Sequence, residues 1–93
     1  MSKKLENLQK LIDQTKSYMQ EAELNGDKEL RFCYMDDARI FSEVVVACSF
    51  GHYNKAKKVI DGMDTEPREQ VVVALAKDLG KDIVANELGW EVR

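Results

Sequence analysis

The chain has 93 residues, of which 44% are hydrophobic and 33% are charged. This length and balance fit one folded domain and exclude a disordered polar segment. Fourteen basic residues oppose 17 acidic ones, and the formal net charge of −3 argues against a protein that coats DNA. The sequence contains no run of about 18 apolar residues, and it starts with a polar helical pattern instead of an apolar signal core. We therefore expect a cytoplasmic protein without a membrane span.

The first half of the chain predicts two long helices joined by a tight turn. Over residues 3–24, apolar and small residues recur at heptad spacing, and Ser2 stands at a favourable N-cap position. Asn25-Gly26 is typical of a helix end, and Asp27 is a good N-cap for a second helix over 28–49. Because the connection is so short, the two helices should pack antiparallel. The heptad positions are Leu5, Leu8, Ile12, Thr15, Met19 and Ala22.

The 28–49 helix carries two apolar stripes, whereas a surface helix normally has one. The front stripe consists of Leu30, Tyr34, Asp37, Phe41, Val44, Val45 and Cys48. The back stripe consists of Phe32, Met35, Arg39, Val46 and Phe50. Two stripes predict neighbours on both sides, with the first helix on the front and another helix behind. Both the bundle arrangement and the binding interpretation below depend on this two-sided coverage.

The second half of the chain predicts three shorter helices, over residues 52–61, 67–79 and 81–88. Glycines separate or end these helices, at Gly51, Gly62, Gly80 and Gly89. The segment 71–76 is apolar on nearly all sides, so its helix should be buried and should cover the back stripe. The sequence thus predicts an all-α fold in a single domain over 1–93, a compact bundle of four to five helices built on an antiparallel helical hairpin.

Short strings in the chain resemble functional motifs but lack their surroundings. Residues 34–37 spell the Tyr-Met-Asp-Asp string of reverse transcriptases, yet adjacent Asp side chains on a helix point about 100° apart and do not converge on one ion. Residues 73–80 resemble the start of a DNA-binding helix-turn-helix, but the next helix offers only one basic residue. Small helical Mg-dependent nucleotide hydrolases use Glu-Glu-x-x-Glu and Glu-x-x-Asp motifs, and neither occurs here.

Nucleophilic or metal chemistry finds little support in the sequence. Cys48 lies one turn before His52, the only histidine, but Cys48 should face the core, where a thiol is unreactive. One histidine and two distant cysteines do not form a tetrahedral metal site. On one continuous helix Cys33 and Cys48 would lie about 22 Å apart, so we expect two free, partly buried thiols. We therefore expect no cofactor, no metal ion and no enzymatic activity.

The candidate partner-binding residues are Phe32, Met35, Arg39, Tyr53, Lys55, Lys57, Lys58 and Trp90. Arg39 interrupts the apolar back stripe, and it should either pair with Asp36 or Glu43 or anchor an interface. The three lysines between residues 55 and 58 form the densest basic patch, suited to phosphate or an acidic partner. Trp90 follows the last helix and should dock on its own domain or on another chain.

These observations predict a small non-enzymatic protein-interaction module, an adaptor, inhibitor or regulator of a larger protein. A phage or mobile-element accessory protein that blocks a host factor fits this description. A homodimer would account for the large amount of apolar surface. The alternative is a nucleic-acid-associated regulator that uses the Lys55, Lys57 and Lys58 patch, and the second alternative is a small helical Mg-dependent nucleotide hydrolase.

Overall fold

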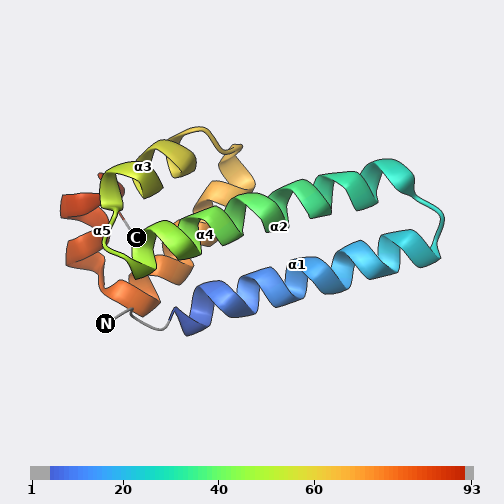
Figure 1. Ribbon diagram of the computed structural model, residues 1–93, viewed down its shortest axis with the longest axis horizontal. Coiled ribbons are helices and arrows are strands. Elements are labelled where there is room, and N and C mark those ends of the chain that lie inside the picture. The colour runs from blue at the N-terminus through green and yellow to red at the C-terminus, as the bar shows by residue number, and fades with distance from the viewer. Residues whose placement is uncertain (1–4, 92–93) are drawn as a thin grey trace.

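The polar and apolar periodicity of the sequence is realised as helices in the computed structural model, which describes residues 5–91 (Figure 1). The helices are α1 (Glu6–Leu24), α2 (Lys28–Ser49), α3 (Tyr53–Asp61), α4 (Thr65–Leu79) and α5 (Lys81–Glu87). The described residues contain no strand, so the predicted all-α bundle is confirmed. Helix α4 begins two residues earlier than predicted. The expected Ser2 cap and the start of the first helix at residue 3 lie outside the described residues.

Helices α1 and α2 form the predicted antiparallel hairpin (Figure 1). Gly26 in the turn has a φ of 72°, which glycine adopts without steric cost. The Asp27 carboxylate accepts a hydrogen bond from the Leu30 backbone N–H at 3.1 Å, as expected of an N-cap. The heptad residues Leu8, Ile12 and Ala22 are buried along the seam. Local sequence signals therefore place this hairpin correctly.

Helices α3, α4 and α5 gather at one end of the hairpin, where α1 begins and α2 ends (Figure 1). The other end, around the turn at residues 25–27, projects beyond them. The shape is accordingly elongated, with extents of 42 × 26 × 22 Å. The core lies at the covered end, and its largest fully buried side chains are Phe41, Leu8, Ile60, Leu75, Leu88, Val44, Val71 and Val84.

The prediction that the 67–79 helix covers the back stripe of α2 is wrong. Helix α4 packs against α1 and α5, and its buried Val71 and Leu75 join the core that already contains Phe41 from the front stripe. The back stripe remains exposed, with 62% exposure at Phe32 and 67% at Phe50. The buried core therefore lies on one side of α2, because the apolar face of α4 packs against α1 and not against the back stripe.

A long-range hydrogen-bond set replaces the local N-cap that α1 lacks. Leu5 occupies the N-cap position, and its side chain has no hydrogen-bonding group. The Asp78 carboxylate, from α4, accepts hydrogen bonds from the backbone N–H groups of Asn7 and Leu8, both at 2.9 Å. It also accepts one from the Asn7 side-chain amide at 2.8 Å. A carboxylate at this position accepts hydrogen bonds from otherwise unpaired N–H groups, and its negative charge interacts favourably with the positive end of the helix dipole. It therefore connects α4 to the start of α1.

Candidate functional site

The exposed back face of α2 is the most extended unpartnered apolar feature of the described chain. We define the α2 stripe as Phe32, Met35, Arg39, Val46 and Phe50, the last residue being the C-cap of the helix. Its four apolar side chains are all exposed, from 41% at Met35 to 67% at Phe50. From residue 32 to residue 50 the stripe spans about 27 Å at the helical rise of 1.5 Å per residue. An exposed apolar row of this length is typical of an interaction surface.

Arg39 occupies the middle of the α2 stripe and is paired on its own helix. Its guanidinium donates to a carboxylate oxygen of Asp36 and to one of Glu43, each at 2.9 Å. These i,i+3 and i,i+4 ion pairs are exposed to solvent, which screens them, so they contribute little to stability. They nevertheless hold the guanidinium in place between two apolar ends, Phe32 with Met35 and Val46 with Phe50.

The projecting end of the hairpin exposes further apolar residues that sequence reasoning missed. Tyr18, Leu24 and Leu30 are exposed, Leu24 to 88%. Tyr18 and Leu30 line a groove of about 230 Å³ between α1 and α2, together with Tyr34. The rings of Tyr18 and Tyr34 lie 5.5 Å apart. We call Tyr18, Leu24 and Leu30 the hairpin tip. The sequence places these residues on either side of the turn. Their exposure follows from the position of α3, α4 and α5 at the other end of the hairpin.

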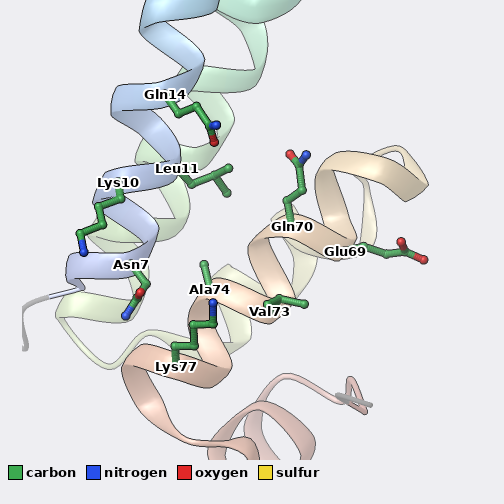
Figure 2. A pocket seen from close by; sticks show the side chains of 9 residues that line it. All are labelled: Asn7, Lys10, Leu11, Gln14, Glu69, Gln70, Val73, Ala74 and Lys77. Atoms are coloured by element: carbon green, nitrogen blue, oxygen red, sulfur yellow. The ribbon is translucent and has the colours of Figure 1, made fainter.

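A shallow groove runs between α1 and α4 and has a volume of about 640 Å³ (Figure 2). Leu11 and Gln14 line it from α1, and Gln70 and Val73 line it from α4. Leu11, Gln14 and Gln70 also border a second pocket of about 490 Å³, which reaches Asp37 on α2. Within residues 5–91, no group of three or more His, Cys, Asp or Glu side chains is placed to hold a metal ion.

The ionisation of Asp37, which lines the second pocket, is perturbed. Partial burial, together with the neighbouring carboxylates of Asp36 and Asp64, raises its pKa above the ordinary value. The Asp37 carboxyl group therefore holds its proton more tightly in the folded chain than in the unfolded chain. The resulting stabilisation is present at low pH and is lost as the pH rises through the folded-state pKa.

We accordingly expect Asp37→Asn to stabilise the chain more at pH 7 than at pH 4, because it removes a charge whose ionisation opposes folding only above that pKa. Denaturant unfolding of the native chain and of Asp37→Asn, at pH 4 and at pH 7, measures this difference. Asp13→Asn, at an exposed position of α1, is the matched control. A loss of stability at pH 7 that is specific to Asp37→Asn would contradict the assignment.

The basic patch lies on α3, and its charges are partly compensated. Lys55 and Lys58 are exposed and lie one turn apart. The Lys57 ammonium donates to a carboxylate oxygen of Asp61 at 2.8 Å, and this contact lowers the pKa of Asp61. Tyr53, at the start of the same helix, packs its ring against the core. Lys57 is thus paired within the helix, and Lys55 and Lys58 are the lysines of the patch that are available to a partner.

Trp90 docks on its own chain. Its indole N–H donates to a carboxylate oxygen of Asp61 at 3.0 Å, and the guanidinium of Arg68 lies 4.6 Å from the ring centroid. The Trp90 backbone N–H also donates to the carbonyl of Val84 at 3.2 Å. These contacts connect the end of the described chain to α3, α4 and α5, so Trp90 acts here as a structural anchor.

The two cysteines differ in environment. Cys33 is exposed on α2, which corrects the expectation of partial burial for both thiols, whereas Cys48 is buried. Burial raises the pKa of the Cys48 thiol to about 11, so it stays protonated at neutral pH. His52, one turn further along the chain, is exposed. Cys48 is therefore an inert core residue, in agreement with the sequence interpretation.

We expect Ellman's reagent to modify one thiol per chain rapidly at pH 7.5, and the second only after unfolding, because the reagent requires an accessible thiolate. Cys33→Ser should abolish the rapid phase, and Cys48→Ala should preserve it. Rapid modification of both thiols in the folded protein would show that Cys48 is not enclosed as described.

Over the described part of the chain, no helix is both long enough and apolar enough to cross a membrane. Comparisons of the chain with protein-family models, with curated proteins and with solved structures found no match.

Proposed function

We propose that the chain is a non-enzymatic protein-interaction module of the cytoplasm, an adaptor, inhibitor or regulator of a larger protein. One observation supports this most strongly. Apart from Val73, all the large hydrophobic side chains exposed in the described residues lie on α1, α2 or the α2 C-cap. A small domain gains nothing in folding from apolar side chains left in water, so their concentration on one hairpin indicates a surface that is covered in a complex.

The larger protein is proposed to bind the hairpin tip. The tip projects past α3, α4 and α5, so a partner reaches it from several sides (Figure 1). Tyr18 and Leu30 present an aromatic ring and an aliphatic side chain beside the groove, and tyrosine is enriched among the residues that contribute most to binding. The acidic residues Glu21 and Asp27 border the same groove and suit a partner with a basic rim.

The test is affinity capture from an extract of the source cells, with the immobilised chain as bait. A specific partner should be retained by the native chain, and Leu30→Asp should lose it, because the substitution places a charge in the contact area. Val73→Asp, a change at an exposed valine on α4, is the matched control and should retain the partner. If Leu30→Asp captures the same proteins as the native chain, the tip is not the binding surface.

The nucleic-acid alternative depends on Lys55 and Lys58, the two exposed and available lysines of α3. It requires binding that weakens steeply with salt, because phosphate contacts release counterions. A salt titration with labelled DNA and RNA, repeated on Lys55→Glu/Lys58→Glu, tests it. Binding that this double variant leaves intact would remove the alternative.

A further inference from the structure

We propose that the α2 stripe is covered by a second copy of this chain, in a homodimer whose two α2 helices lie antiparallel about a two-fold axis at the level of residue 41. The inference shares with the proposed function the premise that apolar surface exposed on the hairpin is binding surface. It concerns a different surface and a different occupant, so each is tested separately.

The first support is the spacing of the stripe, which is symmetric along the helix. Phe32 and Phe50 each lie nine residues from position 41, and Arg39 and Glu43 each lie two residues from it. Met35 and Val46 lie six and five residues away. In an antiparallel pair centred on residue 41, Phe32 therefore lies opposite Phe50 of the second copy and Arg39 lies opposite Glu43. Met35 lies within one residue of the level of Val46. A two-fold interface requires such self-complementarity.

The second support is the position of the side chains around the helix. Phe32 and Phe50 are 18 residues apart, which is five full turns, so they project along the same line. Met35 and Val46 are 11 residues apart, close to three full turns, and they share a line about 50° to one side. A two-fold axis perpendicular to an antiparallel pair keeps each line on its own side. Phenylalanine thus meets phenylalanine, and methionine meets valine.

The third support is charge. In this arrangement the guanidinium of Arg39 faces the carboxylate of Glu43 from the second copy, and the symmetry repeats the contact. Asp36 and Glu43 on the same helix already hold Arg39 at 2.9 Å, so little conformational freedom is lost when the second copy binds. Two ion pairs at the centre with apolar contacts at both ends determine the register, because a shift along the helix would break both sets.

The available area predicts a dimer of moderate affinity. With exposures of 62% and 67%, the two phenylalanines offer roughly 250 Å² per protomer. With Met35, Val46 and the aliphatic part of Arg39, two stripes together cover on the order of 1,000 Å², the lower end for specific interfaces. We therefore expect a dissociation constant in the micromolar range. The hairpin tips would lie at opposite ends of the dimer, available to a larger protein.

Sedimentation velocity over a concentration series tests the dimer. The native chain should shift from monomer to dimer over the micromolar range. Phe50→Asp should weaken association at least about 100-fold, because a carboxylate would be buried against Phe32 of the second copy. Val73→Asp on α4 and Leu30→Asp at the tip should dimerise like the native chain. Far-UV circular dichroism confirms that each variant remains helical.

A charge exchange tests the register. Arg39→Glu alone and Glu43→Arg alone each place like charges opposite one another and should weaken self-association by about tenfold. A mixture of the two single variants should form heterodimers as stable as the native dimer, because each contact between positions 39 and 43 then joins a carboxylate to a guanidinium. Native mass spectrometry distinguishes the species by mass. Within each single variant the helical ion pair between positions 39 and 43 stays broken on mixing, so rescue reports the contact between chains.

A chain that stays monomeric at several hundred micromolar would overturn the proposal, as would a dimer that Phe50→Asp leaves intact. A dimer sensitive to Phe50→Asp but not rescued by mixing would overturn the antiparallel register. None of these outcomes affects the capture experiment with Leu30→Asp, so failure of the dimer and failure of the proposed function are distinguishable.

Discussion

Phe41→Ala should lower the free energy of unfolding by about 3–5 kcal/mol, whereas Phe32→Ala on the same helix should change it by less than about 0.5 kcal/mol. Phe41 is 2% exposed and lies in the core, so truncation removes buried apolar surface and leaves a cavity. Phe32 is 62% exposed, and its truncation removes little from the folded chain. A loss at Phe41 of this size is a large fraction of the stability of a small domain.

Urea unfolding followed by the fluorescence of the single tryptophan, Trp90, measures both variants. The measurement should be made at submicromolar protein concentration, where the proposed dimer is dissociated and Phe32 is exposed to solvent. Equal losses at the two positions would show that both faces of α2 are covered within one chain, as its two apolar stripes predict. Comparison of the two phenylalanines thus tests whether the Phe41 face of α2 is buried within one chain while the Phe32 face is exposed.

Asp78→Ala should cost about 1–2 kcal/mol of stability, because it removes the acceptor for the first N–H groups of α1. The Asp78 carboxylate accepts three hydrogen bonds, two from the backbone N–H groups of Asn7 and Leu8 and one from the Asn7 side chain. Without it, the backbone groups at a partly buried helix end have only water as a partner. The loss should be local as well as global, since the beginning of α1 would fray first.

Amide hydrogen exchange of Asn7 and Leu8, together with urea unfolding, measures the effect. Asp78→Asn should give an intermediate loss, because the amide oxygen still accepts a hydrogen bond but carries no charge. Glu69→Ala, at an exposed position of the same helix, is the control and should be nearly neutral. Unchanged protection of the two amides in Asp78→Ala would contradict the capping role.

The two stripes of α2 predict a helix covered on both sides. Helix α2 is continuous over residues 28–49, as predicted, but Phe32 and Met35 face solvent in the single chain. The all-α bundle is confirmed, but its core lies on one side of α2, so coverage of both sides cannot support a binding surface. The exposed α2 stripe itself supports one, because no helix within residues 5–91 covers it and it is available to a second chain.

Sequence reasoning recovered part of the candidate site. It named Phe32, Met35 and Arg39, because their helical periodicity is visible without any structure. It also named Trp90, which the structure docks on Asp61 and Arg68. It missed the exposure of the hairpin tip, since exposure there depends on how far α3, α4 and α5 extend along the hairpin. Periodicity identifies an apolar face but does not say what covers it.

Local sequence patterns are sufficient to predict the helices, the turn at Asn25-Gly26 and the Asp27 cap, because these depend on hydrogen bonds and side chains within a few residues. Which stripe of α2 is buried and which carboxylate caps α1 depend instead on contacts between residues far apart in the chain. The Asp78 contact joins positions 70 and 71 residues apart, and the apolar face of α4 could have covered either stripe of α2. Such choices follow from the total surface that all the helices bury together, which no local pattern records.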